Sequence, residues 1–229
     1  SRAAQRSYGR IMVKLTSRLS TAASLCRRGG TVCDVGTDHA LLACYLAQTG
    51  AKRVIASDVR EGPLDAARRT IAEQGVTNVE AVLSDGLDRI DFADDVVICG
   101  MGGELIMRII SGCRFLSGDT RFILQPMTKA EVLRRELYRS GFEIMEERAA
   151  ADGERFYSVM LVRHTGVVAE PDELFCYCGK ITDPLMLRHI AGKLEKNAAG
   201  MERSPADSSR AGELRALAGK ITALAHEHE

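Results

Sequence analysis

The chain has 229 residues, of which 45% are hydrophobic and 27% are charged, and its 31 basic residues balance 31 acidic ones. These fractions are typical of globular proteins and exclude a chain that is disordered or fibrous throughout. No apolar run approaches the ~20 residues of a membrane-spanning helix, so we expect a cytoplasmic protein without a membrane segment. No feature of the sequence predicts an assembly, and we expect a monomer.

The first predicted element is a helix over residues 14–28, where apolar residues recur at helical spacing. Seven basic residues precede the first acidic residue, Asp34, so the remainder carries 24 basic and 31 acidic residues, a net charge of −7. From charge alone, this basic segment is either a solvated end or a surface for phosphate groups, and the solvated end is the commoner case.

Short apolar runs then alternate with helical patterns, which predicts a parallel sheet with helices on both faces. The predicted strands are residues 31–35, 54–57, 79–83, 96–99 and 122–124, and the helices are residues 40–48, 63–73, a segment ending at Ile110, and 130–139. Residues 142–148 and 156–162 flank Ala151-Asp152-Gly153, which indicates an antiparallel hairpin. Five parallel strands closed by such a hairpin are typical of Rossmann-like methyltransferases, whereas dinucleotide dehydrogenases usually add another parallel strand.

The composition changes beyond about residue 166, where two segments carry apolar residues at steps of three and four. The first seam comprises Leu187, Ile190, Leu194, Asn197 and Met201, and the second Leu214, Leu217, Ile221 and Leu224. This pattern predicts a helical hairpin resembling a coiled coil, in which Asn197 either fixes the register or breaks the stripe towards solvent. We therefore divide the chain into residues 1–165, the basic helix with the sheet domain, and residues 166–229, the hairpin.

The segment Cys33-Asp34-Val35-Gly36-Thr37-Asp38-His39-Ala40 lies at the first strand-to-helix turn, where doubly wound sheets bind ligands. A dinucleotide site needs glycine where this chain has Asp38, whose carboxylate would repel a diphosphate, so an NAD enzyme is the weakest alternative. S-adenosylmethionine (SAM) has no phosphate. Its ammonium can pair with Asp34 or Asp38, and its carboxylate can meet the helix N-terminus. Asp38 could also be an ordinary N-cap.

Further acidic residues and glycines follow the next strands. Asp58 ends the second strand, where it can accept hydrogen bonds from ribose hydroxyls, and Asp85-Gly86 follows the third, where it can accept from an adenine amino group. Either acid alone is commonly a turn residue, but three acids at one sheet edge form a more specific pattern. Gly100-Met101-Gly102-Gly103 predicts a flexible loop close to a cofactor, or a tight turn. Gln125-Pro126-Met127 either holds a substrate base or ends a strand.

Six motifs occur in a fixed order along the chain. They are Lys14-Leu-Thr-Ser-Arg18-Leu, Asp34-Val-Gly-Thr-Asp-His-Ala40, Gly62-Pro63, Ser84-Asp-Gly-Leu87, Gly100-Met-Gly-Gly103 and Leu124-Gln-Pro126. With them, roughly residues 14–164 resemble the bacterial tRNA (adenine(22)-N1)-methyltransferase family, which modifies an adenine in the D-arm region. The resemblance implies a class I SAM-dependent methyltransferase with a C-terminal coiled coil that acts on tRNA. That family usually has Asn after Gln-Pro, where this chain has Met127.

The resemblance and the pattern of strand ends together give two sets of expected site residues. The cofactor set is Asp34, Gly36, Thr37, Asp38, His39, Asp58, Val59, Asp85, Gly86, Gly100, Met101 and Gly102. The RNA set is Arg10, Lys14, Arg18, Gln125, Pro126, Met127, Arg134 and Arg135. Asp38, His39 and Gln125 are candidates for a catalytic role by position, and no general base is assigned.

Methyl transfer to neutral adenine N1 requires neither a metal nor a covalent nucleophile, although N1 must leave base pairing to react. Cys176-Tyr-Cys178 lacks zinc-ligand spacing, so we expect no metal and reduced cysteines. Two alternatives stay open at this point. The first is a SAM-dependent methyltransferase with another substrate, rRNA or a small molecule, and the second is a non-catalytic tRNA-binding protein that retains the fold.

Overall fold

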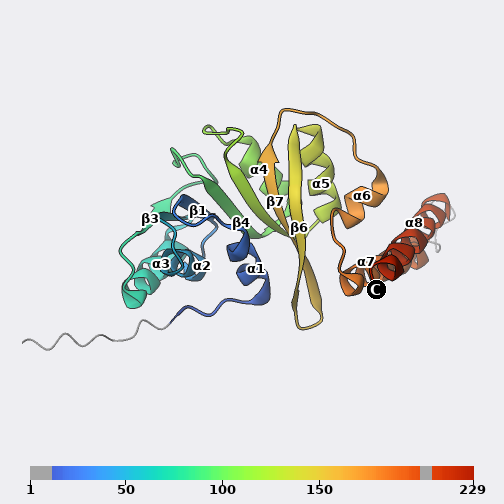
Figure 1. Cartoon of the computed structure of the whole chain (residues 1–229), viewed down its shortest axis with the longest axis horizontal. Helices are drawn as coiled ribbons and strands as arrows, with labels where there is room; N and C mark the ends of the chain where they lie inside the picture. Colours follow the sequence, from blue (N-terminus) through green and yellow to red (C-terminus); the bar gives the residue numbers. More distant parts are fainter. Residues whose placement is uncertain (1–11, 202–207) are drawn as a thin grey trace, which may run out of the picture.

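A computed structural model describes residues 12–201 and 208–229 (Figure 1), so Arg10 lies outside the described residues. Within them, one sheet has the strand order β3-β2-β1-β4-β5-β7-β6. The strands are β1 Thr31–Val35, β2 Arg53–Asp58, β3 Val79–Leu83, β4 Asp95–Gly102, β5 Arg121–Thr128, β6 Phe142–Asp152 and β7 Arg155–His164. Strands β1 to β5 pair in parallel, and β7 pairs antiparallel with β5 and β6. The predicted Rossmann-like sheet and its closing hairpin are confirmed.

Helices cover both faces of this sheet because its strands are apolar on both sides. Along β4, Val97 faces one buried core and its neighbours Val96 and Ile98 face another, as the alternation of side chains along a strand requires. The helices are α1 Ser17–Leu25, α2 Leu41–Gln48, α3 Glu61–Gln74, α4 Gly103–Ser111, α5 Ala130–Arg139, α6 Glu173–Cys178, α7 Pro184–Met201 and α8 Ser208–Glu227. Residues of α1, α2 and α3 belong to the first core, and residues of α4 and α5 to the second.

Helix α1 begins at Ser17, so Lys14 precedes the helix, contrary to the predicted span of 14–28. The backbone N–H of Ser17 donates to Asp152 Oδ1 at 2.8 Å, and Arg148 Nη1 donates to Ser24 Oγ at 2.9 Å. Both partners lie on β6. The first helix of the chain is therefore anchored to the last hairpin of the sheet, and this places α1 beside the carboxyl ends of the central strands.

The C-terminal helices α7 and α8 lie side by side and share a third apolar core (Figure 1). On α7 this core takes Leu187 and Leu194 as predicted, and Ile190 packs against it partly buried. It also buries Ala191 and Ala198, whereas Asn197 and Met201 of the predicted seam are exposed. Asn197 is exposed, which confirms the solvent-facing alternative. The short helix α6 was not predicted, and its Phe175 packs edge-on against Tyr138 of α5 at 5.2 Å.

Among the described residues, no helix combines the length and apolarity that crossing a membrane requires. The same residues contain no cluster of three or more His, Cys, Asp or Glu side chains that could hold a metal ion.

Candidate active site

The first strand-to-helix turn has an unusual backbone conformation. Gly36 has φ +74°, and the N–H groups of Gly36 and Thr37 both donate to the Ser57 carbonyl of β2, at 2.8 and 2.9 Å. Asp38 and Ala40 also have positive φ, +49° and +54°, which is uncommon for residues with side chains and concentrates at functional sites. Helix α2 has Ala40 as its N-cap and no side-chain cap, so the reading of Asp38 as an N-cap is wrong.

Asp34 lies buried at the end of β1, directly below this turn. Its Oδ2 accepts a hydrogen bond from the Thr37 hydroxyl at 2.7 Å. Burial raises the pKa of Asp34 to about 6, against the opposing effect of the Thr37 bond. A cation placed beside this carboxylate would favour its ionised form. The turn therefore provides an acidic group that is prepared to receive a positively charged ligand.

A cavity of about 260 Å³ opens above Asp34. It is lined by Arg18, Leu19, Asp34, Gly36, Thr37, Asp38, His39, Leu41, Leu42, Cys99 and Gly100. A Cβ on Gly36 would require the end of the Met101 side chain to move, and the φ of +74° at this position is itself strained for residues with side chains. The apolar members Leu19, Leu41, Leu42 and Cys99 were not predicted, because single leucines and a cysteine in helical or strand patterns are read as core.

The other two acids follow the neighbouring strands along the same sheet edge. Asp58 is buried at the end of β2, and its Oδ1 accepts from the Arg60 N–H at 3.0 Å, while Val59 between them is exposed. Asp85 is exposed after β3, and its Oδ1 lies 3.3 Å from Nη2 of Arg108. The predicted alignment of Asp34, Asp58 and Asp85 along the sheet edge is thus present in the strand order.

The glycine-rich segment Gly100-Met101-Gly102-Gly103 differs from the flexible loop that its sequence predicts. Strand β4 continues through it, with Met101 paired to Pro126 and Gly102 to Thr128 across two irregularities in register. Gly100 has φ +81°. A Cβ on Gly103 would lie 2.5 Å from the Lys129 carbonyl oxygen, so this glycine permits the close approach of α4 to the end of β5.

Gln125 is fully buried, and the hydrogen bonds of its amide are made within the protein. Its Oε1 accepts from Arg18 Nη1 at 3.0 Å and from the Gly100 N–H at 3.1 Å. Its Nε2 donates to the Pro126 carbonyl at 2.9 Å and approaches Met127 Sδ at 3.6 Å. In this arrangement Gln125 holds Arg18 over Gly100 at the cavity, which is a positioning role. His39 and Asp38 are exposed at the rim, with His39 Nε2 3.7 Å from Asp38 Oδ2.

The basic residues expected at RNA fall into different environments. Lys14 is exposed, Arg18 and Arg135 are half-buried, and Met127 is exposed at 43%. Arg134 is only 1% exposed and is paired with the buried Glu147, with 2.6 Å between Arg134 Nη2 and Glu147 Oε1. The expectation that Arg134 contacts RNA is therefore wrong, because a guanidinium enclosed by its own protein cannot reach a phosphate in solvent.

Comparisons with known proteins agree with this geometry. Residues 15–160 match the model of a methyltransferase domain family. The tRNA (adenine(22)-N(1))-methyltransferase of Bacillus subtilis is 31% identical over 196 residues, which are 83% of this chain and 80% of that one. A ribosomal protein L11 methyltransferase of Anoxybacillus flavithermus is 33% identical, but over only 55% of this chain and 42% of its own.

A solved structure is similar over nearly the whole chain. It is the Streptococcus pneumoniae protein that is assigned to the tRNA (m1A22) methyltransferases and was crystallised in complex with SAM. It is 27% identical, covers 91% of this chain and 100% of its own, and superimposes with a TM-score of 0.79. The likeness therefore extends through the C-terminal helices and beyond the catalytic sheet.

Proposed function

This chain belongs to the tRNA (adenine(22)-N(1))-methyltransferase family, and we propose that it transfers the methyl group of SAM to N1 of adenine 22 in tRNA, in the cytoplasm. The observation that carries the proposal is the placement of Asp34, Asp58 and Asp85 at three neighbouring strand ends of one sheet edge, with Asp34 lining a cavity there. Support for the substrate comes from the Bacillus subtilis relative, because the similarity covers four-fifths of both chains.

The residues at the sheet edge fit SAM. The buried carboxylate of Asp34 suits the ammonium of the methionine end, and the guanidinium of Arg18 in the same cavity can bind its carboxylate. Asp58 is placed for the ribose hydroxyls, and Asp85 can accept from the adenine amino group once it parts from Arg108. Asp38 at the turn disfavours a diphosphate in the same position.

SAM supplies an activated methyl group on a sulfonium. The protein's own contribution is then alignment and exclusion of water, because neutral adenine N1 already carries the lone pair that attacks. Positioning of this kind can provide ~7–11 kcal/mol. Gln125 serves it by fixing Arg18 and the Gly100 N–H at the mouth of the cavity. The target adenine must be unpaired or flipped out to present N1.

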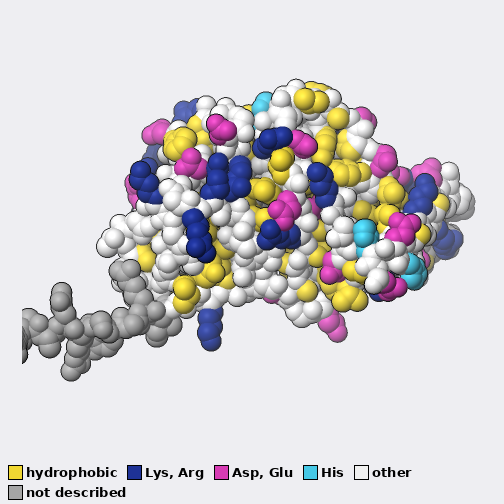
Figure 2. All heavy atoms as spheres, in the orientation of Figure 1, with side chains coloured by type: hydrophobic (Ala, Val, Ile, Leu, Met, Phe, Trp, Pro, Cys, Tyr) yellow, Lys and Arg dark blue, Asp and Glu magenta, His cyan; other side chains and the backbone are white. Residues whose placement is uncertain are grey.

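We further propose that basic side chains around α1 and the hairpin domain (residues 166–229) hold the tRNA backbone. Figure 2 shows Lys and Arg side chains over the region of α1, β4 and β6. Lys14, just before α1, and Arg28, just after it, are exposed, and Arg135 on α5 is half-buried. Because phosphate contacts release counterions, tRNA affinity should fall steeply with salt while SAM affinity changes little.

The direct test is mass spectrometry of nucleosides from tRNA incubated with the protein and SAM. The expected product is 1-methyladenosine at position 22, lost when adenine 22 is replaced by guanine. In parallel, calorimetry should show that Asp58→Ala loses SAM binding, whereas Asp65→Ala, an exposed acid on α3, does not. SAM binding without methylation of any RNA would contradict catalysis, and methyl incorporation into rRNA alone would contradict the tRNA substrate.

A further inference from the structure

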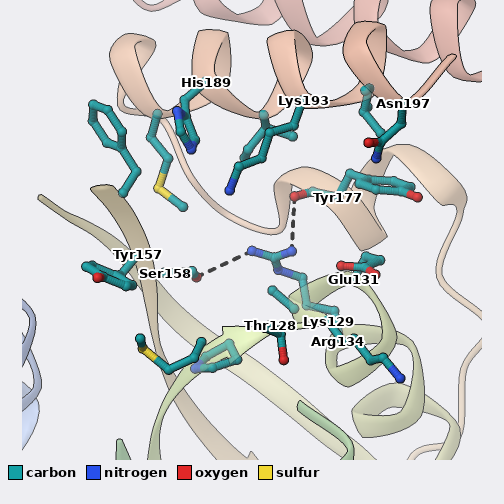
Figure 3. A pocket seen from close by; sticks show the side chains of 17 residues that line it. Thr128, Lys129, Glu131, Arg134, Tyr157, Ser158, Tyr177, His189, Lys193 and Asn197 are labelled. Atoms are coloured by element: carbon teal, nitrogen blue, oxygen red, sulfur yellow. Dashed lines mark hydrogen bonds between the residues drawn. The ribbon is translucent and has the colours of Figure 1, made fainter. Parts of the chain in front are cut away.

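A second cavity, of about 250 Å³, lies between α7 and the ends of β5 and β7 (Figure 3). Its floor contains Pro126 and Met127, the two residues that follow Gln125 on β5. Gln125 in turn holds Arg18 at the cavity above Asp34. The two cavities are therefore neighbours on either side of the end of β5, and the second lies beside the position proposed for methyl transfer.

The second cavity is lined by Lys129, Arg134 and Lys193, and the first two of these are paired with acids. Lys193 extends from α7 into the cavity in Figure 3 and makes no ion pair among the described residues. The guanidinium of Arg134 faces the cavity from below but is neutralised by Glu147. Lys129 at the rim is paired with Glu104 at 2.8 Å. Lys193 is thus the cation that is available to an anionic ligand, although Glu131 also lines the rim.

An aromatic surface lies one helical turn from Lys193. His189 points into the cavity from the same face of α7, and its ring packs on Phe156 with 5.0 Å between centroids. Positions four apart on a helix are ~5–6 Å apart, so a phosphate at Lys193 and a flat group at His189 suit one small ligand. Burial, followed by the charge of Lys193, lowers the pKa of His189, so its imidazole is a neutral ring at neutral pH.

We propose that this cavity binds a nucleotide of the RNA adjacent to the target adenosine, with its phosphate at Lys193 and its base against His189 and Met127. Aromatic rings with a nearby cation are the elements by which proteins hold unpaired nucleotides. The proposal rests on the proposed function, because it requires an RNA substrate. In this proposal α7 contacts the RNA directly and holds the nucleotide next to the flipped-out adenosine.

The test compares Lys193→Ala with Lys196→Ala, a lysine one turn further along α7 that is also exposed but does not line the cavity. Both variants remove one positive charge from the same helix. We expect Lys193→Ala to raise KM for tRNA about tenfold, with kcat and the Kd for SAM unchanged, and Lys196→Ala to change KM less than twofold. Equal effects of the two variants, or none, would overturn the proposal.

A second pair of variants tests the stacking surface. His189→Ala should raise KM for tRNA roughly five- to tenfold, the low end of what loss of one base stack costs, and His189→Phe should restore most of it because the ring is kept. If His189→Phe does not restore KM, the stacking role is refuted.

If the wild-type protein does not methylate tRNA, the proposed function fails. Filter binding of tRNA to the same four variants then decides the cavity proposal, which falls if Lys193→Ala binds as tightly as Lys196→Ala.

Discussion

The buried pair of Arg134 and Glu147 should determine how strongly the segment that begins with α6 is attached to the sheet. Arg134 on α5 donates to Glu147 on β6 and to the carbonyls of Cys176 and Tyr177 on α6, at 2.7 and 3.0 Å. Glu147 Oε2 also accepts from the Lys180 N–H at 2.9 Å, just beyond α6. Three elements from two parts of the chain thus converge on two opposite charges.

Replacing Arg134 by alanine leaves the Glu147 carboxylate buried without its partner. Removal of one member of a buried pair costs ~3–5 kcal/mol, because the remaining charge is neither solvated nor neutralised. At about 2–4 °C per kcal/mol for a chain of this size, Tm should fall by roughly 6–20 °C. The matched control is Arg139→Ala on the same helix, whose exposed pairs with Glu136 and Glu170 should contribute little.

The assay is thermal and urea unfolding followed by circular dichroism, with proteolysis to detect early release of residues 166–229. The double variant Arg134→Met/Glu147→Leu should recover part of the lost stability, because neither charge is left unpaired. A loss in Arg134→Ala no larger than that in Arg139→Ala would refute the reasoning that this pair is held in a low-dielectric interior.

Three further predictions concern the site. SAM should bind roughly tenfold more weakly at pH 5 than at pH 7, because Asp34, with a pKa of about 6, must be ionised to pair with the ammonium. In calorimetry, the SAM affinity of Asp34→Asn should not change with pH. If the affinity of this variant still falls towards pH 5, Asp34 is not the cause of the pH dependence. Gly36→Ala should lower both Tm and SAM affinity, because alanine is strained at a φ of +74° and its methyl group displaces the end of Met101. Normal SAM binding in fluorescence titration would contradict this. Gln125→Leu should weaken SAM binding and lower the single-turnover rate of methylation at least tenfold, because Arg18, which we propose binds the SAM carboxylate, loses its fixed position; an unchanged affinity and rate would contradict the positioning role.

Local sequence signals predicted the sheet well where the side chains follow one clear period. The residue spans of β1, β3 and α5 agree with those expected from the apolar pattern. The ends of β4 and β5 were predicted too short because Gly100 and Pro126 resemble strand breakers. In the structure Pro126 pairs with Met101, and Gly100 is skipped at an irregularity in the register between Cys99 and Met101. No pattern along one strand reveals such cross-strand pairing.

The environment of charged residues was the part that sequence could not predict. Arg134 occupies a helix in a basic stretch and resembles a surface residue, yet its burial depends on Glu147, 13 positions away, and on the unpredicted helix α6. Likewise, Lys193 and His189 carry no motif, and their significance comes from facing the end of β5 across a cavity. In both cases the environment of the side chain is set by packing between distant segments, which residue spacing along the chain does not predict.

The hydrogen bond from Ser17 to Asp152 spans 135 positions, so during synthesis it can form only after the β6–β7 hairpin has been made. A ribosome adds ~5–20 residues per second, so α1 emerges on the order of ten seconds before the β6–β7 hairpin that anchors it. During that interval Arg18 has no fixed place, and the buried face of α1, with Ala22 and Leu25, has yet to find its whole core. One wall of the cavity above Asp34 is therefore made from α1 residues that leave the ribosome before the strands that fix them, so a nascent chain becomes competent for its cofactor only after the sheet has closed.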